Sequence, residues 1–154
     1  TLWLELVVDS NDKQRVKVAD LIEKQLENVG INVSVYKVSN SSYKSYLKNK
    51  NYDMIITGVN NGYSPDLSYF LGEGNIANYE NQEVSSILSD LKTITDQEKI
   101  KEKYNRLIEI YEDELPYICL YRNKSKVIYS IKLTGEFEPN NYSAYYHIEK
   151  WYRQ

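Results

Sequence analysis

The chain has one cysteine and one histidine among its 154 residues. A single cysteine cannot form an intramolecular disulfide or supply a cysteine-based zinc cluster. Cys119 lies in the apolar run 116–121, so we expect a buried and unreactive thiol. His147 has no Cys or Asp spaced to orient it, so we do not expect a catalytic base there. These scarcities argue against an enzyme.

Long apolar runs and basic clusters are also missing. No stretch approaches the ~20 apolar residues of a membrane span, and residues 1–5 do not resemble a signal peptide. The chain starts at Thr1 rather than Met, so we expect a segment of a longer protein. Its 19 Lys and Arg are spread among 22 Asp and Glu, for a net charge of −3. We expect no nucleic-acid partner, because phosphate contacts need cations gathered on one face.

Glycine is scarce as well, and none of the six glycines builds a phosphate-binding loop. Residues 58–62 lack the Lys and the following Ser or Thr of such a loop, and no glycine cluster follows the first apolar run. The acidic residues do not match the spacing of a calcium loop, and we expect Asp9, Asp12 and Asp66 to cap helices. We therefore expect neither a cofactor nor a bound metal.

Hydrophobic patterning predicts an α/β fold. The first half of the chain alternates apolar runs typical of buried strands with segments whose apolar residues recur at helical spacing. The predicted order is strand 2–8, a helix that ends near Gly30, strand 31–38, a short helix after Ser39, and strand 52–57. Because parallel strands are joined by crossover helices, this β-α-β-α-β order predicts a parallel-dominated sheet flanked by helices.

The second half is predicted to begin with helices. Residues 59–80 form a long loop around at most one helical turn, after which Asn81 caps a helix. A capping box at 95–98 begins a longer helix. We expect its buried face to carry Ile100, Tyr104, Leu107, Ile108, Tyr111 and Leu115. Residues 117–121 and 127–133 are predicted strands, and the rest is an irregular tail.

Ligands of open parallel sheets bind beyond the carboxyl ends of the strands. Two segments are predicted to lie there: Ser10 and Asn11 after the first strand, and residues 58–66 after the third. The second segment contains amides, a tyrosine and glycines, which can hydrogen-bond a ligand and let it approach the backbone. This composition favours recognition over catalysis. The alternative interpretation is a solvated loop with turn residues.

Short motifs in a fixed order extend along nearly the whole chain. They are Leu4–Val8, Arg15-x-x-x-Ala19-x-x-Ile22-x-x-x-Leu26-x-x-x-Gly30-Ile31-x-Val33, Tyr43-x-x-x-Leu47, Tyr52-Asp53-Met54 with Gly58 and Pro65-Asp66, Asn75, Asn78-Tyr79-x-Asn81-x-Glu83-Val84, Asp96 through Tyr104, and Glu114-x-Pro116-x-Ile118-x-Leu120-Tyr121. Taken together, this series resembles the second lobe of the family 5 extracellular solute-binding proteins.

The resemblance implies a type II periplasmic-binding-protein fold, in which two α/β lobes joined by a hinge close on a solute. Members bind oligopeptides, dipeptides, nickel or other small solutes and deliver them to the permease of an ABC transporter. They lie in the periplasm or are held at the extracellular face of the membrane by an N-terminal lipid. On this resemblance, residues 1–122 are the ligand-binding lobe and residues 123–154 return toward the first lobe.

The same resemblance implies where the solute binds. The expected cleft residues are Val59, Asn60, Asn61, Gly62, Tyr63 and Asp66, with Ser10 and Asn11 at the rim. Peptide-binding members tend to have Trp at the position of Val59, and near Asn61 or Gly62 an Asp that pairs with the peptide's amino terminus. An amide cannot supply that charge-assisted bond. The expected solute is therefore a peptide or another small molecule that is uncharged or anchored differently.

Two other classes of function fit parts of the sequence. A flavodoxin-like enzyme has the same β-α-β-α-β beginning and would bind a phosphate or flavin at the loop after the third strand. An interaction domain would present the tyrosines of residues 142–152 as an exposed patch. The 16 tyrosines of the chain suit a pocket wall or such a patch. The resemblance favours the non-enzymatic solute-binding lobe.

Overall fold

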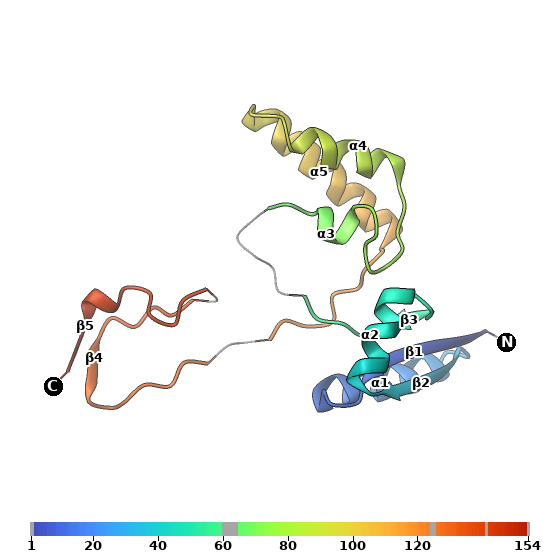
Figure 1. The fold of residues 1–154 in the computed structure, drawn as a ribbon, viewed down its shortest axis with the longest axis horizontal. Helices are drawn as coiled ribbons and strands as arrows, with labels where there is room; N and C mark the ends of the chain where they lie inside the picture. The colour runs from blue at the N-terminus through green and yellow to red at the C-terminus, as the bar shows by residue number, and fades with distance from the viewer. Residues whose placement is uncertain (1, 60–64, 124–125, 141, 154) are drawn as a thin grey trace. The chain divides into compact units, whose positions relative to one another are not determined.

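The structure is a computed structural model, and its contacts divide the chain into two units, Thr1–Tyr117 and Ile118–Gln154 (Figure 1). The described residues are 2–59, 65–123, 126–140 and 142–153. Within these ranges no helix is both long enough and apolar enough to cross a membrane.

The first unit begins with a three-stranded sheet of order β2-β1-β3. Strand β1 is Trp3–Asp9, β2 is Asn32–Val38 and β3 is Met54–Ile55, and β1 pairs in parallel with both neighbours. Helices α1 (Lys13–Glu27) and α2 (Asn40–Asn49) make the two crossovers. This arrangement confirms the predicted parallel α/β architecture.

Strand β1 is the centre of the sheet and of its core. Val7 and Val8 are fully buried, and Leu6 is 2% exposed. Leu6 and Val8 pack with Ala19 of α1 and with Ile56, which follows β3. Successive side chains of a strand point to opposite faces, so the continuous apolar run reflects burial on both faces of the sheet. The sequence predicted this burial correctly for Leu6–Val8, whereas Leu2 and Trp3, at the start of the predicted strand, are 56% and 67% exposed.

Local interactions set the two ends of α1. The Asp12 carboxylate accepts a hydrogen bond from the Arg15 N–H at 3.0 Å, which satisfies a free donor of the first turn. Gly30 follows the helix at φ +84°, a left-handed conformation that residues with a side chain rarely adopt. The Ile31 N–H then donates to the Leu26 carbonyl at 3.0 Å. The chain therefore enters β2 directly after the helix.

Strand β3 is shorter than the predicted strand 52–57. Only Met54–Ile55 forms a ladder with β1. The Asp53 carboxylate accepts the Glu5 N–H at 2.8 Å, and Glu5 lies in β1. At the amino end of β3 a side chain has thus taken a donor that a main-chain carbonyl would otherwise use. Near the carboxyl end, the Ile56 carbonyl accepts the Tyr43 hydroxyl at 2.8 Å.

The remainder of the first unit is helical. Helix α3 is Ser68–Leu71, α4 is Gln82–Leu91 and α5 is Gln97–Glu114 (Figure 1). They share a core of buried residues, namely Leu71, Val84, Ile87, Leu88, Leu107 and Ile110. The Asn81 side chain accepts a hydrogen bond from the Val84 N–H at 3.1 Å, which confirms the predicted N-cap of α4.

The start of α5 differs slightly from the prediction. A capping box at 95–98 would place Thr95 at the N-cap, but the N-cap is Asp96. The Asp96 carboxylate accepts hydrogen bonds from the N–H groups of both Glu98 and Lys99. A carboxylate with two such donors displaces the hydroxyl cap that the pattern suggested.

The buried face of α5 also differs from the prediction. Ile108 and Leu115 are 54% and 57% exposed, whereas Ile110 is 6% exposed. Ile110 lies three positions after the buried Leu107, so the two share one face of the helix. Leu115 follows the last turn in a left-handed conformation, at φ 43°. The prediction was therefore right for Leu107, Tyr104 and Tyr111, which pack in or against the helical core, and wrong for Ile108 and Leu115.

The second unit contains little regular structure. Its elements are β4 (Leu133–Gly135), a 3₁₀ helix η1 (Ile148–Lys150) and β5 (Trp151–Arg153), and β4 pairs antiparallel with β5. Phe137 stacks on Tyr129 with ring centroids 4.0 Å apart. A short hairpin and aromatic contacts therefore hold this unit together.

The predicted strands 117–121 and 127–133 do not form. Only Leu133, at the end of the second, lies in a strand of the described chain. Ile128 and Ile131 are 94% and 95% exposed. A strand needs a neighbour for its N–H and C=O groups, and an apolar pattern cannot supply that neighbour. The prediction was therefore wrong for these segments.

Cys119 is exposed, which contradicts the expected buried thiol. Its neighbours Ile118 and Leu120 are exposed as well, at 76% and 48%. Because this run does not belong to a sheet in the described ranges, the thiol lacks the cover that the prediction assumed.

We expect Leu107→Ala to lower the free energy of unfolding by about 2–5 kcal/mol, because Leu107 is 2% exposed and its loss leaves a cavity among the helices. Ile108→Ala is the matched control and should change stability by ~0.5 kcal/mol or less, since Ile108 is 54% exposed. Urea unfolding followed by circular dichroism measures both variants. Equal losses of stability in the two variants would contradict the assignment of Leu107 to the buried face of α5 and of Ile108 to its exposed face.

Candidate functional site

The carboxyl ends of the three parallel strands form one edge of the sheet. The Ser10 N–H donates to the Val38 carbonyl at 2.8 Å, which ties the end of β1 to the end of β2. The Ile56 N–H donates to the Val7 carbonyl at 3.0 Å, and Gly58 beyond it lies against the Arg15 side chain of α1, so the chain leaves β3 beside the segment that follows β1. Segments distant in the sequence thus meet at the edge where ligands of open α/β sheets bind.

Asp9 is a buried carboxylate at this edge, only 8% exposed. It accepts hydrogen bonds from the side-chain amide of Asn40, at 2.7 Å, and from the Asn11 N–H, at 2.9 Å. These bonds, with smaller contributions from the charges of Arg15 and Lys44, hold the pKa of Asp9 below its usual range. The Asn40 bond joins the end of β1 to the start of α2.

The role of Asp9 differs from the one expected from the sequence. We predicted a helix cap, but the N-cap of α1 is Asp12. Asp9 is the last residue of β1, three positions before Asp12. Its carboxylate accepts hydrogen bonds from the Asn11 N–H and from the side-chain amide of Asn40 instead of capping α1. Asp9 therefore organises the loop after β1.

Arg15 lies against Gly58, which follows β3; it begins one of the motifs of the sequence analysis but was not predicted as a site residue. Its Nε is 3.0 Å from Asp12 Oδ2, and its side chain is 26% exposed. A Cβ added to Gly58 would lie 2.1 Å from Arg15 Nη2, so the guanidinium covers the Gly58 backbone. A cation in the first turn of a helix is disfavoured by the helix dipole, by about 0.3–1 kcal/mol. This unfavourable position of a cation in the first turn is the feature of the sequence that could have drawn attention to Arg15.

The predicted site residues divide into three groups. Ser10 and Asn11 follow β1 at the edge, and Val59, 40% exposed, comes directly after Gly58. The structure therefore brings these predicted rim and wall residues to one edge. Asn60, Asn61, Gly62 and Tyr63 lie outside the described residues.

Asp66 bonds the first turn of α3, although the N-cap residue of that helix is Leu67 rather than Asp66. Its Oδ1 accepts a hydrogen bond from the Ser68 N–H at 2.9 Å, as in the helix-capping interpretation. Hydrogen bonds from Ser68 also lower the pKa of Asp66. The carbonyl of the preceding Pro65 accepts the Tyr104 hydroxyl of α5 at 2.8 Å. The loop after β3 is thus anchored to the helices at its far end.

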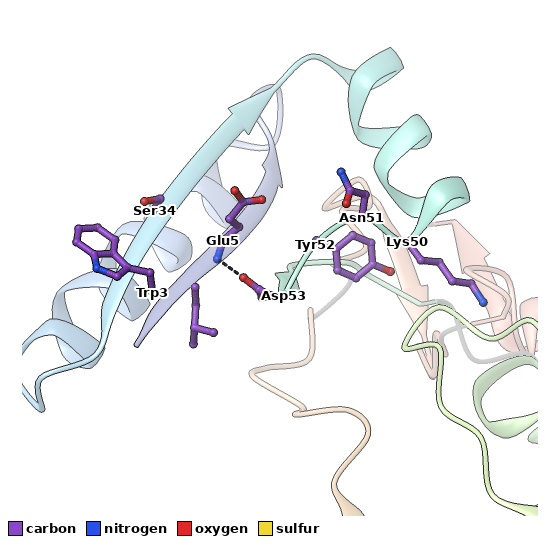
Figure 2. Close-up of a pocket in the computed structure, with 8 residues that line it drawn as sticks. Trp3, Glu5, Ser34, Lys50, Asn51, Tyr52 and Asp53 are labelled. Carbon is purple, nitrogen blue, oxygen red and sulfur yellow. Dashed lines mark hydrogen bonds between the residues drawn. The ribbon is translucent and has the colours of Figure 1, made fainter. Parts of the chain in front are cut away.

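A hollow of about 470 Å³ lies at the opposite edge of the sheet, near the amino ends of β1 and β3 (Figure 2). Its lining includes Trp3, Glu5, Ser34 and residues 50–53. Figure 2 shows the Asp53 carboxylate against the Glu5 N–H within it. The hollow does not coincide with the predicted site, because that site lies at the carboxyl ends of the strands.

The side chains of Ser10 and Asn11 at the carboxyl edge can both donate and accept hydrogen bonds. Both oxygens of Asp9 and both of Asp12 already have partners. No group of three or more His, Cys, Asp or Glu within the described ranges is arranged to hold a metal ion. His147 belongs to the second unit, where its Nδ1 is 2.8 Å from Glu149. The edge therefore suits the binding of polar groups better than proton transfer.

Solved structures share this fold over most of the chain. The oligopeptide-binding protein AppA of Bacillus subtilis, in complex with a nonapeptide, has a TM-score of 0.72 at 22% identity, covering 99% of this chain and 32% of that one. NikZ of Campylobacter jejuni, in complex with Ni(L-His), has a TM-score of 0.70 at 18% identity, covering 99% and 33%. A periplasmic oligopeptide-binding protein of Thermotoga maritima, bound to mannohexaose, has a TM-score of 0.68 at 24% identity, covering 77% and 24%. The fold is that of the periplasmic binding proteins, as predicted.

Sequence comparison assigns the family. Residues 1–78 match the model described as "Bacterial extracellular solute-binding proteins, family 5 Middle". This chain belongs to that family, which confirms the resemblance noted in its motifs. Over 156 residues it is 24% identical to AppA of Bacillus subtilis, covering 96% of this chain but only 28% of AppA. The chain thus spans about a third or less of the length of these relatives, which are named as binding proteins rather than as enzymes.

We expect Asp9→Asn to lower stability at neutral pH, because an amide cannot accept both the Asn11 and Asn40 hydrogen bonds as a carboxylate does. The folded-state pKa of Asp9 is depressed, so its contribution is complete above the unfolded value of about 3.9 and is lost as the pH falls through the folded value. Urea midpoints of wild type and variant should therefore differ at pH 7 and converge as the pH falls below the folded-state pKa of Asp9.

Asp20→Asn is the control for this experiment, because Asp20 is exposed and pairs only with Lys37 in a surface ion pair. Its effect should be small at every pH. If the urea midpoints of Asp9→Asn and wild type differ by the same amount at every pH, the contribution of Asp9 to stability does not depend on its charge. That result would contradict the prediction.

Proposed function

We propose that this chain is a ligand-binding lobe of a two-lobed solute-binding protein that serves an ABC importer. Its membership in family 5 is the observation that carries the proposal, and the polar carboxyl edge supports it. Closure of a second lobe over this edge would bury the solute on two sides. The solute then passes to the membrane permease, and no chemical step is required of the lobe.

The proposed contacts lie on the two segments that follow β1 and β3. Val59, Asn60, Asn61, Gly62, Tyr63 and Asp66 would line the cleft, with Ser10 and Asn11 at its rim. Ser10 and Asn11 are supported by their position after β1, and Val59 by its position just beyond the end of β3. Amide and hydroxyl groups on both segments can bind acceptors of a solute.

The proposed solute is a peptide or another small molecule. Structures that share the fold hold a nonapeptide, mannohexaose or Ni(L-His), so this fold accommodates chemically different solutes. Val59 offers an aliphatic wall, and Asn61 and Gly62 offer no negative charge to a peptide's amino terminus. These residues favour a solute that is anchored through groups other than an ammonium.

We also propose that residues 1–122 form the lobe and that residues 123–154 pack against the other lobe. The exposure of Ile128 and Ile131, at 94% and 95%, supports this, because an apolar run needs a partner to cover it. The protein would act in the periplasm or at the extracellular face of the membrane. Its link to the membrane would be an N-terminal lipid on the longer polypeptide.

Thermal-shift screening of the longer polypeptide that contains this chain tests the proposal. Trialanine to nonaalanine peptides, mannohexaose and Ni(L-His) are the probes. At 100 times Kd, a solute that binds only the native state should stabilise it by about 2.7 kcal/mol, which raises Tm. The 154-residue chain alone should show no shift with the same probe, because it supplies one side of the cleft. Binding by the chain alone at micromolar concentration would contradict the two-lobed design.

Asn61→Ala and Asn51→Ala are the matched variants for the active probe. Asn61 is a proposed cleft residue, whereas Asn51 lines the hollow at the opposite edge of the sheet. Loss of one neutral hydrogen bond should weaken binding about 3–10-fold for Asn61→Ala. Asn51→Ala should bind as wild type does. If Asn51→Ala weakened binding and Asn61→Ala did not, the site would lie in the hollow at the opposite edge of the sheet.

A further inference from the structure

The hollow at the amino edge of the sheet takes no part in the proposed cleft. Its volume is about 470 Å³ (Figure 2). On one face of the sheet, Leu6 and Val8 of β1 pack with Ala19 of α1. Trp3 and Glu5 alternate with these two residues along the strand, so their side chains point to the opposite face. The hollow therefore lies on a face of the sheet that α1 does not cover.

Trp3 presents an open aromatic ring at this hollow. Its side chain is 67% exposed, whereas tryptophan is highly buried on average in folded proteins. An indole has a large apolar face and a polar N–H at its rim, so it can pack against a ligand and also donate a hydrogen bond to it. A merely solvated surface accounts for the polar side chains around the hollow, but it does not account for an exposed tryptophan among them.

Two carboxylates that line the same hollow have acceptor oxygens left for a ligand. Glu5 Oε1 accepts the Tyr36 hydroxyl at 3.3 Å, and Asp53 Oδ2 accepts the Glu5 N–H at 2.8 Å. Within the described ranges, neither Glu5 Oε2 nor Asp53 Oδ1 has a hydrogen-bond partner. Ser34 and Asn51 add a hydroxyl and an amide to the lining. The hollow thus combines an aromatic face with acceptors and donors.

The wall formed by residues 50–53 is fixed by contacts outside the hollow. Lys50 Nζ donates to Asn78 Oδ1 at 3.2 Å, and the Tyr52 hydroxyl donates to the Ile76 carbonyl at 2.7 Å. Figure 2 shows the Lys50 side chain extending away from Glu5, so its charge does not neutralise the two carboxylates. A wall that is already held in place loses less conformational entropy when a ligand binds.

A second hollow continues the first along α2. Its volume is about 260 Å³, and its lining consists of hydroxyl, phenol and amide side chains, namely Ser42, Ser45, Tyr46, Asn49 and Asn51. Asn51 also lines the first hollow, so the two adjoin, and we call them together the amino-edge groove. Two adjoining hollows, the second lined without a charged side chain, fit a ligand made of several neutral polar units.

We propose that the amino-edge groove binds a neutral oligosaccharide of β-1,4-linked glucose units. In such a unit the ring C–H groups lie on two flat faces, and the hydroxyl groups project around the rim. One face packs on the Trp3 indole, and rim hydroxyls donate to Glu5 and Asp53. A hydroxyl that donates to a carboxylate forms a charge-assisted bond, about twice as strong as a neutral one. Ser34 and Asn51 bind further hydroxyls as donors or acceptors.

This site goes beyond the proposed function, because it lies at the opposite edge of the sheet from the cleft and needs no second lobe. The groove is open to solvent, so the surface that it buries on a sugar is limited and we expect a Kd in the millimolar range. A saccharide held there would attach the protein to a glycan without occupying the cleft.

Calorimetric titration of the longer polypeptide with cellohexaose tests the inference. Maltohexaose is the reference probe, because its α-linkages curve the chain and keep successive rings from lying flat along the groove. We expect cellohexaose to bind about tenfold more tightly than maltohexaose, which corresponds to about 1.4 kcal/mol.

Variants at the groove should weaken this binding. Trp3→Ala should raise the Kd for cellohexaose about tenfold, whereas Trp3→Phe should stay within about threefold of wild type because it keeps an aromatic face. Glu5→Gln should raise the Kd about 3–10-fold, since it removes a charged acceptor. Tyr69→Ala is the matched control, because Tyr69 of α3 is 61% exposed and does not line the groove. Asn61→Ala, in the proposed cleft, should bind cellohexaose as wild type does.

Tm of each ligand-free variant shows whether it is folded, and Trp3→Phe and Glu5→Gln keep the test decisive if Trp3→Ala is not. No binding of cellohexaose by wild type at millimolar concentration would overturn the inference, and so would equal affinities for the two sugars. Weaker binding in Asn61→Ala with unchanged binding in Trp3→Ala would place the sugar in the cleft. That result would refute the groove and leave the proposed function standing, because the cleft is tested with other probes.

Discussion

The burial of β1 between two parallel neighbours is the constraint on which the first unit depends. Val7 and Val8 are fully buried, and the strand pairs along its whole length with β2 and at two positions with β3. Parallel pairing requires crossover helices, so all three strands end at the same edge. The residues that follow those ends are therefore brought together, although more than forty positions separate Ser10 from Gly58 in the sequence.

The chemistry of this edge follows from which groups already have partners. Asp9 is occupied by Asn11 and Asn40, and Asp12 by the first turn of α1. Ser10 and Asn11, which follow β1, have side chains that can both donate and accept hydrogen bonds. These polar side chains support the proposed role of the edge in holding a solute.

The second unit illustrates the limit of apolar patterning. Residues 117–121 and 127–133 have the composition of strands, yet only Leu133 is in one in the described chain. Apolar composition indicates that a segment needs cover, but a ladder also needs a neighbouring strand with free N–H and C=O groups. In the proposed two-lobed protein that neighbour would come from the other lobe, and the exposed Ile128 and Ile131 would then be buried.

The sequence by itself determined the two-sided burial of Leu6–Val8 in β1, the Asn81 cap of α4 and the parallel arrangement of the strands. These depend on residues within a few positions of one another or on a general rule of parallel sheets. Only the tertiary structure decided that Asp53 takes the Glu5 N–H across 48 residues and that Arg15 covers Gly58. Such contacts depend on which residues, distant in the sequence, meet in space. Periodicity and capping patterns describe only residues close together in the sequence and therefore contain no information about these contacts.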